Sequence, residues 1–256
     1  MHHKSIDVNC DLGESYGHAR VGQDERLMPF LSSANIACGF HGGDPGTIHR
    51  TVRLAQDSGV SIGAHPSYPD LAGFGRRRMD MSPQEVYDCM LYQMGALSGF
   101  VRAAGGEMKH VKPHGALYNQ AVREPVLAEA IVHSVYYFDK SLFLFGPAGS
   151  ALESAARKTG LGFCREVFAD RTYQPDGGLT PRSSHGSVIS DVSVSLQQVD
   201  DILLRGYVTC ADGTRIPMEA DTICVHGDGP DAFDILSTLR RHLADLDIDI
   251  NPPKQR

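Results

Sequence analysis

The sequence predicts a closed barrel of seven parallel strands, with helices and loops returning the chain between them. Three observations support this fold class. Strand-like and helix-like segments alternate along the 256 residues, no linker divides them, and the glycine fingerprint of a dinucleotide-binding sheet is absent. An open, doubly wound sheet is the alternative, but no point where the strand order would reverse is evident. We therefore expect one irregular (β/α) barrel domain over residues 1–256.

Seven segments have the short apolar or alternating pattern of barrel strands. They are residues 5–10, 33–38, 60–65, 107–112, 142–145, 162–169 and 222–226. The third segment stops at Pro66, because proline has no N–H to continue a ladder.

Helices are expected between these strands, and their start signals differ in strength. The expected ranges are 45–58, 83–104, 124–138, 149–158, 195–205 and 230–245. The second has the clearest start, since Ser82 can act as N-cap and Glu85 completes a capping box. Residues 207–218 predict a hairpin that turns at Asp212-Gly213. Residues 170–189 are rich in Gly, Pro and Ser, which indicates a functional loop.

Composition excludes some classes of partner. The net charge of −7 argues against nucleic acid or an anionic membrane. Six cysteines without a Cys-x-x-Cys motif indicate free thiols. No signal peptide is recognised and no apolar run approaches the ~18 residues of a membrane span. We expect a cytoplasmic protein, and homo-oligomerisation stays open.

Polar side chains follow six of the seven predicted strands. They are Asp11 and Glu14, His41 and Asp44, His65, Lys112 and His114, Asp170 and Arg171, and His226 and Asp228. In parallel barrels the carboxyl ends of the strands meet at one mouth, where active sites lie. The sequence therefore predicts a shared site there.

Alternation along the strands gives a second argument for this site. Asp7, Asn9 and Asp11 share one face of their strand, since successive side chains point to opposite faces. A barrel interior that also contained Lys112 and His65 would be costly unless these groups were paired or bound to a ligand.

Two further patterns carry less chemistry. His110 and His114 have the i, i+4 spacing of helical metal ligands, but an extended chain separates them by ~13 Å, at ~3.3 Å per residue. We do not expect them to share an ion. Arg76, Arg77 and Arg78 predict a solvated or subunit-contact patch, with an anion site as the alternative. A Walker-type loop that would cradle a nucleotide is absent from the sequence.

Six motifs resemble those of the LamB/YcsF family, and the resemblance covers residues 5–250. They are residues 7–15 (DVNCDLGES), 33–41 (SANIACGFH), 60–77, 111–119 (VKPHGALYN), 166–171 (EVFADR) and 223–228 (ICVHGD). One departure is His185, where proline is frequent. The resemblance implies a TIM-like barrel related to the glycoside hydrolase/deacetylase superfamily. It also implies the A component of an ATP-dependent 5-oxoprolinase, which opens the lactam of 5-oxoproline to glutamate with separate subunits B and C.

Lactam chemistry suggests roles for the strand-end residues. Asp11 would activate water, with His114 or His226 as the acid and Asp170 in the same catalytic set. Lys112, Arg171, Asn9 and Tyr118 would bind the substrate. A divalent metal, if bound, would use Asp11, His41 and His65. ATP would be the co-substrate and would be bound by, or shared with, the partner subunits.

Two other functions remain open at this stage. One is a metal-dependent amidase or deacetylase that acts alone. The other is a non-catalytic subunit that binds the lactam and presents it to its partners.

Overall fold

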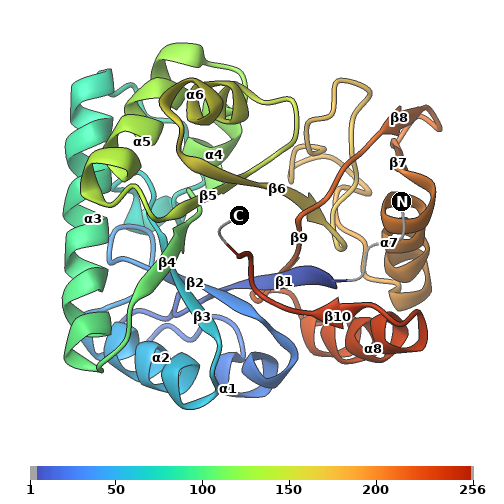
Figure 1. The fold of residues 1–256 in the computed structure, drawn as a ribbon, viewed down its shortest axis with the longest axis horizontal. Coiled ribbons are helices and arrows are strands. Elements are labelled where there is room, and N and C mark those ends of the chain that lie inside the picture. Colours follow the sequence, from blue (N-terminus) through green and yellow to red (C-terminus); the bar gives the residue numbers. More distant parts are fainter. Residues whose placement is uncertain (1–4, 255–256) are drawn as a thin grey trace.

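Seven parallel strands close into the predicted barrel in the computed structural model, which describes residues 5–254 (Figure 1). The strands are β1 (Ser5–Leu12), β2 (Ser33–Ala37), β3 (Ser61–His65), β4 (Met108–Val111), β5 (Phe143–Gly146), β6 (Gly162–Phe168) and β9 (Thr222–His226). Each strand pairs with the next, and β9 pairs with both β6 and β1. This closure confirms the barrel and excludes the open sheet.

The main helices surround the barrel (Figure 1). They are α2 (Pro45–Asp57), α3 (Pro83–Ala103), α5 (Pro125–Phe138), α6 (Ala151–Thr159), α7 (Val192–Arg205) and α8 (Ala232–Asp245). The capping box of α3 is confirmed, since the Ser82 hydroxyl accepts from the Glu85 N–H and the Glu85 carboxylate accepts from the Ser82 N–H. Within residues 5–254, no helix is long and apolar enough to cross a bilayer.

Short elements account for most differences from the sequence prediction. The helices α1 (Asp24–Leu27) and α4 (Gly115–Ala121) have too few turns to show a helical period. The strand β10 (Asp249–Ile250) is two residues long and pairs with the start of β1. The predicted hairpin is confirmed, as β7 (Tyr207–Thr209) and β8 (Arg215–Pro217) pair antiparallel outside the barrel.

The two faces of β1 differ in chemistry. Ile6, Val8 and Cys10 belong to the apolar core, whereas Asp7 and Asn9 are buried polar residues. Asp7 accepts hydrogen bonds from the hydroxyls of three neighbouring residues, Ser32, Ser33 and Thr222. The polar interior is thus internally paired, which offsets the cost of burying it.

Candidate functional site

A cavity of about 640 Å³ opens at the carboxyl ends of the barrel strands. Predicted site residues from five strand ends line it: Asp11, His65, Lys112, His114, Arg171 and His226. The parallel topology therefore brings these residues together, as the sequence predicts.

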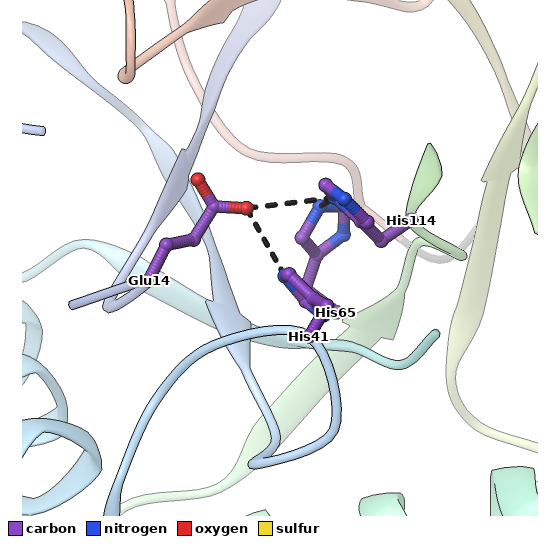
Figure 2. Close-up of side chains that lie close together, drawn as sticks. All are labelled: Glu14, His41, His65 and His114. Carbon is purple, nitrogen blue, oxygen red and sulfur yellow. Dashed lines mark hydrogen bonds and ion pairs between the residues drawn. The ribbon is translucent and has the colours of Figure 1, made fainter. Parts of the chain in front are cut away.

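Four buried side chains form a compact cluster at one side of this cavity (Figure 2). Glu14 follows β1, His41 follows β2, His65 ends β3, and His114 precedes α4. One nitrogen or oxygen atom of each lies within 4.8 Å of those of the other three. Three imidazoles and a carboxylate are a donor set that zinc uses in proteins.

Backbone carbonyls fix the tautomers of two imidazoles in this cluster. The Nδ1 of His65 donates to the Lys112 carbonyl at 2.7 Å, and the Nε2 of His114 donates to the Phe74 carbonyl at 2.8 Å. A carbonyl oxygen can only accept, so these nitrogens carry the hydrogens. The other two nitrogens, His65 Nε2 and His114 Nδ1, face each other at 2.9 Å.

Two facing lone pairs at this distance require a cation between or beside them. Burial, with the neighbouring His41 and His65, lowers the pKa of His114 well below its ordinary value, so a proton is disfavoured there. A divalent metal ion satisfies both nitrogens at once. Metal-binding histidines typically donate their outer N–H to a carbonyl, as His65 and His114 do here.

Glu14 and His41 complete the donor set. The Glu14 Oε1 lies 3.1 Å from His41 Nε2 and 3.5 Å from His114 Nδ1. Burial, with a contribution from Asp11, raises the pKa of Glu14 to about 8. The Nδ1 of His41 is buried and has no hydrogen-bond partner within residues 5–254. A buried carboxyl and an unpartnered imidazole nitrogen fit a site built for a metal ion.

Lys112 lies at the floor of the cavity between two carboxylates. Its Nζ is 2.9 Å from Asp11 Oδ1 and 2.9 Å from Glu166 Oε1. Burial alone would lower the pKa of Lys112, but the nearby carboxylates outweigh it and hold the pKa well above its ordinary value. Asn9 and Tyr118 also donate to Glu166, at 3.1 and 2.8 Å. Three residues assigned to substrate from the sequence therefore belong to one buried network.

His226 and Asp170 form a separate pair on the cavity wall. The Nδ1 of His226 lies 3.1 and 3.0 Å from the two Asp170 oxygens, and its ring stacks on Phe168. Burial would raise the pKa of Asp170, but His226 outweighs it and the pKa stays below its ordinary value. A carboxylate on Nδ1 leaves Nε2 for acid–base work.

The position of Arg171 is less open than the sequence predicts. Its Nε donates to the Ser187 carbonyl at 3.0 Å, and its Nη2 donates to the Thr180 carbonyl at 2.6 Å. Arg171 lines the cavity, but these bonds hold the loop between β6 and α7 against the barrel.

Comparison with known proteins agrees with this architecture. The sequence model of the LamB/YcsF family matches residues 6–256. The chain belongs to the LamB/YcsF family. Two relatives, each named as the A component of 5-oxoprolinase, come from Brevibacillus brevis, at 52% identity over 96% of this chain and 97% of that protein, and Methylococcus capsulatus, at 54% over 94% and 93%.

Solved structures extend the comparison of this LamB/YcsF protein to the fold. A lactam utilization protein from Thermus thermophilus is 45% identical, covers 96% of this chain and 99% of its own, and has a TM-score of 0.90. The catalytic domain of a peptidoglycan N-acetylglucosamine deacetylase from Eubacterium rectale is 10% identical, with 98% and 89% coverage and a TM-score of 0.52. The latter supports the fold relationship alone.

Sequence reasoning misses part of the site in this LamB/YcsF protein. The sequence pattern places Glu14 near Asp11 without indicating a role, and it suggests His114 as an acid. In the structure Glu14 and His114 lie in the four-residue cluster, while Asp11 lies beside it, with Oδ2 3.4 Å from His65 Nε2. Glu166 stands out in the sequence only as part of a motif. A signal for Glu14 exists in Gly13, whose φ of +69° turns the chain back over the barrel mouth.

Backbone contact positions Glu14, and this contact leads to a prediction. A Cβ on Gly42 would lie 2.5 Å from the Glu14 carbonyl oxygen. We expect Gly42→Ala to weaken metal binding by about 10- to 100-fold, as displacement of supporting groups does elsewhere. Metal titration of the apo protein measures this. Gly95→Ala in α3 is the control, since a Cβ there meets nothing within 4 Å. Equal affinity in both variants would contradict the role of Gly42.

Proposed function

We propose that this chain is the A component of an ATP-dependent 5-oxoprolinase, which hydrolyses the lactam of 5-oxoproline to glutamate with subunits B and C. The names of its relatives support the substrate. The observation that carries the chemistry is the pair of acceptor nitrogens on His65 and His114, 2.9 Å apart beside the cavity. Such a pair fits a metal ion that assists hydrolysis.

Opening a stable five-membered amide requires an activated carbonyl, a nucleophilic water and protonation of the leaving nitrogen. A metal ion held by Glu14, His41, His65 and His114 would supply a Lewis acid at the barrel mouth. Burial would raise the pKa of Asp11, but His65 and Lys112 hold it well below its ordinary value, so Asp11 is ionised. This carboxylate orients the water and accepts its proton.

His226 is the proposed proton donor. Asp170 holds its Nδ1, so Nε2 can deliver a proton to the ring nitrogen as the C–N bond breaks. The products are the free amine and the new carboxylate of glutamate. Water supplies the oxygen and both hydrogens, so the hydrolysis balances.

ATP enters the proposal as a second substrate. Transfer of its γ-phosphoryl group to the lactam oxygen would give a better electrophile than the amide, and water would then release phosphate. The sequence has no Walker-type loop, so we assign the nucleotide to the partner subunits or to a site shared with them.

Glutamate release from 5-oxoproline tests this function. We expect release by the purified chain only in the presence of ATP and of subunits B and C. Hydrolysis by the chain alone without ATP would instead support a stand-alone metal-dependent amidase, which the His/Glu cluster also fits. Near-normal turnover of Asp11→Asn in the complete enzyme would support a non-catalytic, lactam-binding role.

The pair on the cavity wall gives a second prediction. We expect Asp170→Asn to lower kcat by about 10²- to 10⁴-fold, because an amide no longer holds His226 in the tautomer that leaves Nε2 free. Steady-state glutamate release measures kcat, and metal analysis should show unchanged metal content. Asp200→Asn is the matched control, since Asp200 accepts from His242 at 2.7 Å between α7 and α8. A similar kcat for the two variants would remove Asp170 from the mechanism.

A further inference from the structure

We propose that Arg76 and Arg182 bind the carboxylate of the lactam substrate at the mouth of the cavity. This assignment rests on the proposed function and adds to it two residues that determine specificity. It also moves the anion-binding role away from Lys112 and Arg171, where the sequence placed it.

The two arginines come from different loops and meet at one carboxylate. Arg76 follows β3, Arg182 lies between β6 and α7, and both line the cavity. Arg76 donates from Nη2 to Asp228, which follows β9, and Arg182 Nη2 lies 3.9 Å from the other Asp228 oxygen. Their side chains are 39% and 31% exposed, so a ligand can reach them.

The Arg76 guanidinium lies close to the proposed metal ligands. Its central carbon is 4.9 Å from the centre of the Phe74 ring. That ring is in turn 5.3 Å from the ring of His114 and 5.5 Å from the ring of His41. A small lactam acid can therefore present its carbonyl to the His/Glu cluster and its carboxylate to Arg76.

The other charged groups of the cavity are already paired. Lys112 lies between Asp11 and Glu166. On the wall, Asp170 pairs with His226, and on the rim Arg123 pairs with Asp176. Of the charged residues described around the mouth, Asp228 alone faces both Arg76 and Arg182, which leaves an excess of positive charge.

The neighbouring Arg171 adds to this excess. Burial, with Arg182 and Arg76 nearby, lowers the pKa of Arg171 to about 10, so the three guanidinium groups are close enough to repel one another. An incoming anion relieves this repulsion.

Guanidinium groups suit a carboxylate because their planar N–H donors match its two oxygens. Arg76 uses only one of its nitrogens on Asp228, and Arg182 contacts Asp228 only at ion-pair distance. Donors therefore remain for a ligand. In 5-oxoproline the carboxylate is on the carbon next to the ring nitrogen, on the side away from the carbonyl, so both ends of one molecule are recognised.

The test compares the binding of 5-oxoproline with that of 2-pyrrolidinone, the same ring without the carboxylate. Calorimetry on the metal-loaded chain would use wild type, Arg76→Gln and Arg182→Gln. We expect each substitution to weaken 5-oxoproline binding about 10- to 100-fold, the range for hydrogen bonds to charged groups, and to leave 2-pyrrolidinone unchanged. Arg182→Lys should recover only part of the affinity, since lysine lacks the planar fork.

Arg78→Gln is the matched control. Arg78 belongs to the same run of arginines but is 72% exposed and pairs with Glu124 away from the cavity. Its variant should bind 5-oxoproline as wild type does. Unfolding midpoints within experimental error of wild type confirm that all variants are folded.

Three outcomes overturn the assignment, and they are distinguishable. If wild type does not bind 5-oxoproline, the proposed function fails and the carboxylate site fails with it. If wild type binds it and the Arg76 and Arg182 variants bind equally well, only the carboxylate site fails. If the variants raise KM for ATP in the complete enzyme while 5-oxoproline affinity is unchanged, the arginines bind phosphate instead.

Discussion

Replacing His114 with alanine is expected to remove the divalent metal ion from the protein and to abolish most of its activity. The Nδ1 of His114 faces His65 Nε2 at 2.9 Å, and the Phe74 carbonyl holds its ring in place. Loss of this nitrogen leaves three donors. Since a metal ion contributes several kcal/mol to stabilising the transition state, kcat should fall on the order of 10³-fold. Elemental analysis of the purified variant and the glutamate assay measure the two effects.

His133→Ala provides the control for this experiment. His133 lies on α5 and is exposed, so its loss should change neither metal content nor kcat. A full complement of metal in His114→Ala would show that the four-residue cluster is not the metal site. Retained activity without metal would show that the metal has no part in the reaction.

Replacing Lys112 with methionine is expected to destabilise the fold by about 3–5 kcal/mol. The substitution leaves the Asp11 and Glu166 carboxylates buried without their shared cation, and breaking a buried ion pair has this cost. Urea unfolding measures the change. Lys109→Met is the control on the same strand, because Lys109 is 58% exposed and pairs only with Glu107. We expect it to change the free energy of unfolding by no more than about 0.5 kcal/mol.

The pH dependence of this stabilisation follows from Asp11. Its pKa in the folded protein lies well below the ordinary value of 3.8, so the folded state favours the ionised form. The contribution is therefore present above about pH 4 and is lost as the pH falls toward the folded pKa. Unchanged stability in Lys112→Met, combined with weakened 5-oxoproline binding, would contradict the buried network and support Lys112 as a substrate ligand.

The sequence predicts the barrel well because its signals are local. Strand alternation, the Ser82 capping box and the Asp212-Gly213 turn each depend on a few neighbouring residues. Parallel topology then places the strand ends together without knowledge of any distance. The gathering of Asp11, His65 and His226 at one cavity follows from these rules alone.

Roles within the site are harder to predict, because they depend on partners far away in the chain. Lys112 resembles a free cation until Glu166, 54 residues further on, is seen beside it. His114 can serve as a metal ligand because the Phe74 carbonyl fixes its tautomer. Arg76 resembles a surface residue until the loop that contains Arg182 is placed opposite. Such contacts leave no periodic trace in the sequence.

The pairing of β1 with both β2 and β9 has a consequence for how the protein is made. Asp7 on β1 shares a hydrogen bond with Thr222, 215 residues later, and β10 joins β1 later still. The first strand to leave the ribosome therefore acquires its second neighbour only near the end of synthesis. Contacts with so large a sequence separation form slowly, so nascent chains expose an unpaired strand edge for most of translation. This edge is a natural point of engagement for chaperones.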